Sequence, residues 1–214
     1  MANLIIYYSR KGENYWNGTI KNLAKGNTQT AAEFIQKAVG GDLFEVETVK
    51  QYAKDYYACI DEAQKELRAG VRPELKAYPE NIEGYDNIFL GYPNWWGTMP
   101  MAMYTLLEHF DWTGKKIIPF CTNEGSGMGS PERDLAKVCK GATIARGLSA
   151  HGAATAQSES KIADSSKKNV SGGVRMRTCL RSGGSSGCGS ELTQRHLTSV
   201  ETVGGTVVTS EKRR

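Results

Sequence analysis

With 214 residues, 39% of them hydrophobic and 23% charged, the chain has enough apolar material for the core of one α/β domain with an appendage, which excludes global disorder. Its longest apolar stretch, 99–107, falls far short of the roughly 20 residues that a membrane helix needs, and its N-terminus lacks the pattern of a secretory signal, so we expect a cytoplasmic protein with no membrane span. The net charge of +4 resides in residues 171–214, because residues 1–170 contain 20 basic and 20 acidic side chains. The seven basic residues of 171–214 are scattered, with few aromatic residues between them, and do not indicate nucleic-acid binding.

The first half of the chain alternates between strand and helix patterns. Residues 4–8 form a short apolar run that is typical of a strand buried on both faces. A helix follows at 28–39, with apolar residues at i, i+3, i+4 and i+7 and two glycines at its end. Residues 43–49 alternate apolar and acidic side chains, as an edge strand with one solvent-exposed face does, and 56–69 is a second helix that Gly70 ends.

The second half continues this alternation. A buried strand is expected at 87–92 and a helix at 99–110. The strand at 116–121 contains Pro119, which indicates a bulge or an exposed edge because proline cannot donate to a ladder. The remaining elements are a helix at 131–139, a fifth strand at 142–148 and a last helix from about 157 to 169.

This βαβαβαβαβα order predicts an α/β fold with a doubly wound, five-stranded parallel sheet and helices on both faces. Residues 1–170 are expected to form this domain, with residues 171–214 as a C-terminal extension. Ligands in such folds bind beyond the carboxyl ends of the strands, near the switch in strand order. The loops after the first, third and fourth strands should therefore carry the function.

The first loop has groups that can hold a phosphate. Ser9 supplies a hydroxyl and Arg10 a cation, and Asn27 and Thr28 stand where the N–H groups at the start of a helix point outward. Residues 13–25 look like an insertion between the two halves of this site. An ordinary polar loop with a helix N-cap at Asn27 or Thr28 is the alternative, and the motif of a nucleoside-triphosphate loop is missing.

The second loop, residues 92–100, contains two adjacent tryptophans at a strand end. A flat aromatic ligand would use Trp95 or Trp96 as a stacking wall, and Gly97 lets the backbone approach that ligand closely. Two tryptophans of the core or of an interface are the alternative.

The third loop, residues 122–129, contains three glycines among polar residues and can wrap the edge of a ring with backbone donors and acceptors. It lacks the last glycine of the dinucleotide-binding motif and the flanking glycines of a hydrolase nucleophile turn. A flexible connector is the alternative interpretation. Three such loops at the expected strand ends are together stronger evidence for a ligand site than any one of them.

These residues resemble those of the flavodoxins, in particular a bacterial branch of the family. The resemblance covers about residues 3–170, and its signatures are Tyr7-Tyr8-Ser9-Arg10, the run from Gly91 to Pro100 and the run from Pro119 to Gly127. It implies the strand order 2-1-3-4-5 and flavin mononucleotide (FMN) bound without a covalent bond. By position, Ser9, Arg10, Asn27 and Thr28 would hold the phosphate; Pro93, Asn94, Trp95, Trp96, Gly97 and Thr98 would flank the isoalloxazine ring; and Thr122, Asn123, Glu124, Gly125, Ser126 and Gly127 would close around its other edge.

The resemblance implies electron transfer through FMN to or from a redox partner protein. An NAD(P)H-dependent reductase of small quinones or nitro compounds is the alternative, because familiar electron-carrier flavodoxins are acidic whereas residues 1–170 are neutral. A module that has lost its cofactor is a third reading. No residue stands out as an acid or base catalyst: His109 is expected on a helix surface, His151 in a loop, and Glu124 at the ring edge or as a helix cap.

The tail, residues 171–214, is rich in Ser, Gly and Thr and is expected to be flexible. Residues 182–187 are typical of a linker, and 197–209 would suit a hairpin that is marginal on its own. The cysteines are scattered and odd in number, which favours reduced thiols over disulfides or a metal site: Cys59, Cys121, Cys139, Cys179 and Cys188.

Overall fold

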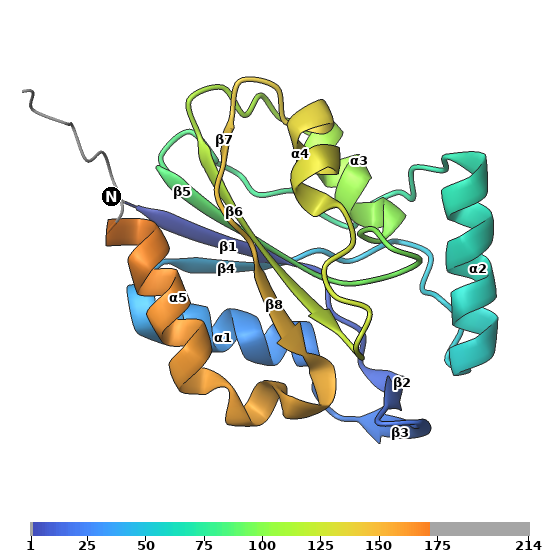
Figure 1. Cartoon of the computed structure of the whole chain (residues 1–214). Helices are drawn as coiled ribbons and strands as arrows, with labels where there is room; N and C mark the ends of the chain where they lie inside the picture. Colours follow the sequence, from blue (N-terminus) through green and yellow to red (C-terminus); the bar gives the residue numbers. More distant parts are fainter. Residues whose placement is uncertain (1, 172–214) are drawn as a thin grey trace, which may run out of the picture. The chain divides into compact units, whose positions relative to one another are not determined.

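The computed structural model describes residues 2–171, which form a central parallel sheet with helices on both faces (Figure 1). The strand order is β4-β1-β5-β6-β7, and β8 pairs with β6 further along that strand than β7 does. With β7 and β8 counted together as the fifth strand, this is the order 2-1-3-4-5, so the predicted fold is confirmed. The strands of this sheet are β1 (Asn3–Tyr7), β4 (Asp42–Glu45), β5 (Asn87–Pro93), β6 (Lys116–Asn123), β7 (Thr143–Ile144) and β8 (Leu148–His151).

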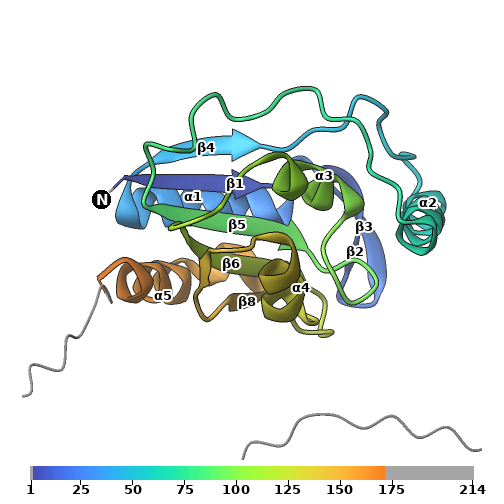
Figure 2. The ribbon, with the colours of Figure 1, turned by 90° about the horizontal axis from the view of Figure 1, so that it is seen from above.

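All five predicted helices form, with ends within two residues of the prediction. Helices α1 and α5 lie side by side on one face of the sheet, and α3 and α4 pack on the other (Figures 1 and 2). Helix α2 lies beyond the carboxyl ends of the strands, next to a small hairpin. The helices are α1 (Asn27–Val39), α2 (Tyr56–Ala69), α3 (Met101–His109), α4 (Pro131–Val138) and α5 (Glu159–Ser171), with a short 3₁₀ helix, η1 (Gly152–Gln157), before α5.

The sheet is buried on both faces, which explains the uninterrupted apolar runs of its strands. Successive side chains of a strand point to opposite faces, so β1 needs apolar residues at every position. Ile5 belongs to the core beneath α1 and α5, whereas Leu4 and Ile6 belong to the core beneath α3 and α4. Ile35 of α1 and Leu106 of α3 are fully buried in these two cores.

The edge strand is shorter than predicted. Residues 43–49 were expected to be extended throughout, but β4 ends at Glu45. The amide of Val46 still donates to the carbonyl of Tyr7 (2.7 Å), the last residue of β1. Beyond that point the neighbouring strand offers no further partners, and Thr48 instead forms an antiparallel bridge with Leu75.

The fifth strand, predicted as one segment at 142–148, is divided into β7 and β8, and Pro119 accounts for the division. The ladder between β6 and β5 continues through this buried proline. The carbonyl of Ile117 accepts from the amide of Ala145, so the missing N–H of Pro119, two residues later, faces the fifth strand. The bulge or exposed edge expected at Pro119 is therefore a break in the neighbouring strand.

The insertion in the first loop forms a hairpin that the sequence analysis did not predict. Strands β2 (Gly12–Trp16) and β3 (Thr19–Leu23) pair in antiparallel register and form a sheet of their own. Asn17 (φ 46°) and Gly18 (φ 89°) form the tight turn, as Asn-Gly pairs commonly do.

No helix among residues 2–171 is long and apolar enough to cross a membrane. The linker and the hairpin expected within residues 182–209 lie outside the described residues.

Gly91 is the position in β5 where a side chain has no room. A Cβ there would lie 2.1 Å from the ring of Phe120 on the neighbouring strand. We expect Gly91→Ala to lower the free energy of unfolding by about 1–3 kcal/mol, because the ring must shift within a packed core. Urea unfolding measures this. Gly84→Ala, where the nearest atom would be 3.7 Å away, should stay within about 0.5 kcal/mol of the parent chain; equal effects would contradict the packing.

Candidate functional site

A cleft opens at the carboxyl edge of the sheet, where the three predicted loops meet. Eight of the sixteen predicted site residues line it: Arg10, Asn27 and Thr28 from the first loop, Pro93 and Trp95 from the second, and Thr122, Asn123 and Glu124 from the third. Four residues that the sequence analysis did not select complete the wall: Asn14, Tyr15, Tyr56 and Gly152.

The start of α1 lines this cleft and has N–H groups without an acceptor. Gly26 occupies the N-cap position without a side-chain cap, so the helix begins at Asn27 rather than being capped there. Ser9 Oγ accepts from the amide of Gln29 (3.0 Å), and among the described residues nothing accepts from the amides of Asn27 and Thr28. Two unpaired N–H groups at the positive end of a helix dipole are a site for an anion.

Arg10 brings its cation to the edge of the cleft while bonding to the backbone. Its Nε donates to the carbonyl of Glu13 (2.9 Å) and its Nη2 to that of Lys54 (2.8 Å). These bonds tie the first loop to the segment that leads into α2.

A buried hydroxyl pair joins the first loop to the third. Thr28 Oγ1 and Thr122 Oγ1 lie 2.8 Å apart, and both residues are buried. Since each hydroxyl uses the other as its partner, the start of α1 and the end of β6 are held at a defined separation below the cleft.

The tryptophan pair forms a tight turn. Trp95 and Thr98 exchange two backbone hydrogen bonds (2.9 and 3.1 Å), with Trp96 (φ 55°) and Gly97 (φ 83°) between them, which is the pattern of a type I′ turn. Trp96 is a bulky residue in a left-handed conformation, is 49% exposed, and donates its indole N–H to the carbonyl of Ile60 in α2 (3.0 Å). The turn is thus strained and is attached to α2.

The two tryptophans have different environments. Trp95 packs edge-on against Tyr8 (ring centroids 5.5 Å apart) and Tyr52 (5.2 Å) and still lines the cleft, so it serves packing and the wall together. Trp96 is outside the lining. Thr98 is buried, and its hydroxyl bonds to Tyr104 (2.8 Å) and Asp134 (3.1 Å), on the side of α3 and α4.

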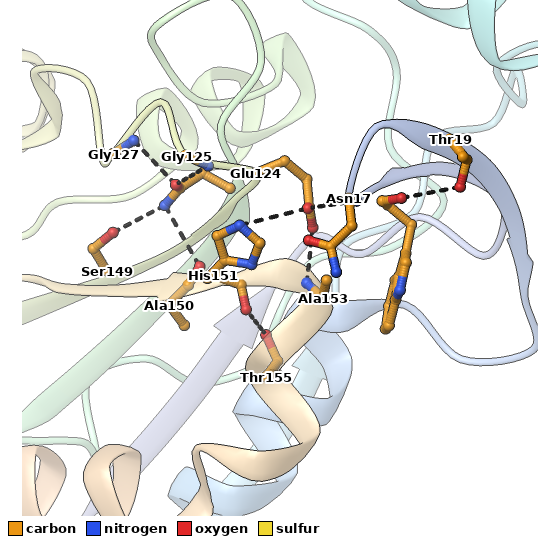
Figure 3. Close-up of polar contacts among 12 residues, drawn as sticks. Asn17, Thr19, Glu124, Gly125, Gly127, Ser149, Ala150, His151, Ala153 and Thr155 are labelled. Carbon is orange, nitrogen blue, oxygen red and sulfur yellow. Dashed lines mark hydrogen bonds and ion pairs between the residues drawn. The ribbon is translucent and has the colours of Figure 1, made fainter.

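Two asparagines give the third loop its shape. Asn123 Oδ1 accepts from the amides of Gly125 and Gly127 (3.0 Å each), and its Nδ2 donates to Ser149 (2.9 Å; Figure 3). Asn94 of the second loop donates to Ser126 Oγ (3.0 Å) and to the carbonyl of Gly127 (2.8 Å). The third loop is therefore an ordered segment clamped to the second.

Asn94 also has an oxygen without a partner. Its Oδ1 is buried and accepts no hydrogen bond from the described residues. Buried acceptors usually have a donor, so this oxygen is an exception, and Asn94 does not line the cleft.

Glu124 does not cap the next helix. Its Oε1 accepts from the amide of Ala153 (2.8 Å) and its Oε2 from that of Asn17 (3.2 Å), and His151 Nε2 lies 3.7 Å from Oε2 (Figure 3). His151 is exposed at the end of β8 near the site, and His109 is exposed on α3 as predicted.

The described thiols are not nucleophiles. Burial raises the pKa of Cys59 to about 11 and those of Cys121 and Cys139 to about 12, so all three are neutral near pH 7. Cys179 and Cys188 lie outside the described residues. Within residues 2–171 no group of three or more His, Cys, Asp and Glu side chains gathers as a metal site.

The four missed residues come from segments whose position only the fold reveals. Asn14 and Tyr15 reach the cleft on the β2–β3 hairpin, whose Asn-Gly turn is the one signal in the sequence that could have found it. Tyr56 begins α2 and stacks on Tyr15, with ring centroids 6.2 Å apart. Gly152 follows β8 and lies against Glu124 and Asn27.

The fold and the cleft define a doubly wound α/β protein with a cleft at its topological switch point, where proteins of this class bind ligands. The sequence model of the flavodoxin family matches residues 21–165, which is more than half of the chain. The chain therefore belongs to the flavodoxin family. The match begins within the hairpin, so Ser9 and Arg10 lie outside it. No curated protein matches the chain in sequence.

Solved structures of flavoproteins share this fold. A candidate flavoprotein from Bacteroides uniformis is 27% identical with a TM-score of 0.63, over 78% of this chain and 98% of its own. Another from Bacteroides eggerthii is 29% identical with a TM-score of 0.58, over 76% and 98%. A flavoprotein from Lactobacillus acidophilus, solved in complex with FMN, is 21% identical with a TM-score of 0.52, over 74% and 98%, and shows likeness of fold alone.

The threonine pair below the cleft can be tested by removing one hydroxyl at a time. We expect Thr28→Val to lower the free energy of unfolding by about 1–2 kcal/mol, because the buried hydroxyl of Thr122 loses its partner. The double variant T28V/T122V should regain part of this loss, since both polar groups are then replaced by methyls. Urea unfolding of the flavin-free chain measures both. Strictly additive losses would show that the hydroxyls do not pair.

Proposed function

We propose that this chain binds FMN at the switch-point cleft and transfers electrons through it. One observation carries the proposal: the first two amides of α1, those of Asn27 and Thr28, have no acceptor among the described residues, and both residues line the cleft together with the second and third loops. A phosphate group is the anion that suits such a helix start.

The cleft fits FMN on two counts. The amides of Asn27 and Thr28 would hold the phosphate, with Arg10 as the nearby cation. Trp95 and Pro93 offer an apolar wall for the ring. When bound, FMN supplies the one- and two-electron chemistry, and the protein contributes binding, orientation and electrostatics.

A second candidate is an NAD(P)H-dependent reductase of small quinones or nitro compounds. It is favoured by the exposed aromatic rings of Tyr15, Tyr57 and Trp96, which come from the hairpin, α2 and the second loop around the cleft and could receive a flat substrate. Rapid oxidation of NAD(P)H by the purified holoprotein in the presence of a quinone would support this candidate. Reduction only through a partner protein would support the carrier.

The role of the helix start can be measured with two flavins. We expect the flavin-free chain to bind FMN at least about 100-fold more tightly than riboflavin, because two hydrogen bonds to a charged phosphate contribute about 1.5–3 kcal/mol each. Quenching of flavin fluorescence in a titration gives both affinities. Equal affinities would mean that the phosphate is not held at α1, and no binding of either flavin would overturn the proposed function.

The Trp96-Gly97 peptide is proposed to lie beside the reactive nitrogen of the ring. Gly97→Ala places a Cβ on a residue with φ 83° and so restricts how this peptide can turn. We expect at least one midpoint potential of the bound flavin to shift by roughly 40 mV, which corresponds to about 1 kcal/mol for one electron.

Redox titration of the variant and the parent chain makes the comparison. Gly114→Ala is the matched control, because Gly114 also has a positive φ (76°) with open space around it, but lies at the opposite end of β6. If Gly97→Ala leaves both potentials at their parent values, the peptide has no role in tuning the flavin.

A further inference from the structure

The β2–β3 hairpin forms one wall of the cleft without belonging to the central sheet. In the sequence it lies between Arg10 and the start of α1, and it contributes Asn14 and Tyr15 to the lining of the cleft. Its two strands pair only with each other. A lone two-stranded hairpin is marginally stable in water, so its position over the cleft depends on its contacts with other segments.

Strand β2 of the hairpin is attached to α2. Glu13 Oε2 accepts from the amide of Tyr56 at the start of α2 (2.8 Å), and the carbonyl of Glu13 accepts from Arg10 (2.9 Å). The rings of Tyr15 and Tyr56 stack with an interplanar angle of 28°. These contacts fix the side of the hairpin that is nearest to α2.

The tip is attached to the opposite wall through Glu124. The amide of Asn17, in the exposed turn, donates to Glu124 Oε2 (3.2 Å), while Oε1 accepts from Ala153 at the start of η1 (2.8 Å; Figure 3). The carboxylate thus joins three segments: the hairpin, the third loop and η1. Hydrogen bonds to an ionised acceptor are the stronger kind, and this side chain is only 16% exposed.

The surroundings of Glu124 hold the carboxylate in this orientation. A Cβ on Gly152 would lie 2.4 Å from Oε1 and 2.7 Å from the side-chain nitrogen of Asn27. The side chains of Glu124 and Asn27 therefore occupy space that is free only because residue 152 is a glycine. Both carboxylate oxygens already accept from backbone amides, so their main contacts are with the hairpin and η1.

We propose that Glu124 is a positioning residue that fastens the tip of the hairpin across the cleft and thereby sets how fast FMN is released. This inference rests on the proposed function, because FMN is the ligand whose release is followed. With the tip free, the hairpin is held only on the side of α2, by Glu13 and by the stack of Tyr15 on Tyr56. Its turn can then move away from the third loop, which opens the cleft between the hairpin and that loop.

The first experiment uses Glu124→Gln in the full chain. Glutamine keeps one oxygen acceptor but replaces the other with an amide donor, so it cannot accept from both Asn17 and Ala153. We expect FMN release, followed by fluorescence after a chase with excess competing apoprotein, to become about tenfold faster. Hydrogen exchange at the amides of the hairpin, residues 13–22, should also accelerate in the flavin-free chain.

Glu132→Gln is the matched control, because Glu132 also accepts from a backbone amide, that of Gly147 (3.4 Å), but on α4 and away from the hairpin. It should leave both readouts at the parent values. A Glu124→Gln chain with parent release and parent exchange would overturn the proposal.

A second variant distinguishes two ways in which Glu124 could slow the release of FMN: by holding the tip of the hairpin, or by acting directly on the flavin. Gly12 and Leu23 face each other across the hairpin, so joining them directly removes residues 13–22 and leaves Glu124 with Ala153. This shortened chain should release FMN at least as fast as Glu124→Gln, and adding Glu124→Gln to it should change little further.

If Glu124→Gln keeps its full effect in the shortened chain, Glu124 acts on the cofactor itself, and the proposal that it acts through the hairpin is wrong. If the parent chain binds no FMN, the proposed function is wrong, and so is the proposed effect of Glu124 on FMN release. The exchange comparison, which needs no flavin, still decides whether Glu124 holds the hairpin.

Discussion

The junction between β1 and α1 is the constraint on which the site depends. A Cβ on Gly26 would lie 2.1 Å from Ser9 Oγ and 2.6 Å from the carbonyl of Arg10, so the chain can pass there only as glycine. Ser9 in turn accepts from the amide of Gln29, which sets the first turn of α1 against the end of β1. The next anchor is the Thr28–Thr122 pair, which fixes that turn relative to β6. The unpaired amides at the start of α1 thus belong to backbone held between two strands, and their position does not depend on mobile side chains.

The loops around this junction are tied to one another as well as to the sheet. Asn94 clamps the second loop to the third, and Gly129 lies so close to the carbonyl of Gly97 that a Cβ would be 1.9 Å from it. Glu124 links the third loop to the hairpin and η1. Such mutual support orders a binding site before its ligand arrives, which limits the entropy lost on binding.

The predicted fold class and helices were correct because those features follow from local periodicity and from apolar runs long enough to be buried on both faces. The strand order, which was also correct, came from the resemblance to the flavodoxins and not from any local pattern. The errors lie where partners decide the extent of an element. Residues 46–49 read as strand, yet β1 offers them no partner after Tyr7. The fifth strand was predicted as one continuous segment. It is divided because Pro119 on the neighbouring strand has no N–H to donate to the middle of it. The hairpin was missed because its strands are polar, with the Asn17-Gly18 turn as their main local signal.

The sequence by itself determined the alternation of strands and helices and the three loops gathered at the carboxyl edge of the sheet, because hydrophobic period and turn residues act over a few positions along the chain. Only the tertiary structure decided which contacts the residues of those loops make. Arg10 bonds to backbone carbonyls, Thr98 turns toward α3 and α4, and Glu124 fastens a hairpin 107 residues earlier in the chain. Side chains such as these find their partners through packing between segments far apart in sequence, and no local pattern encodes which partner that will be.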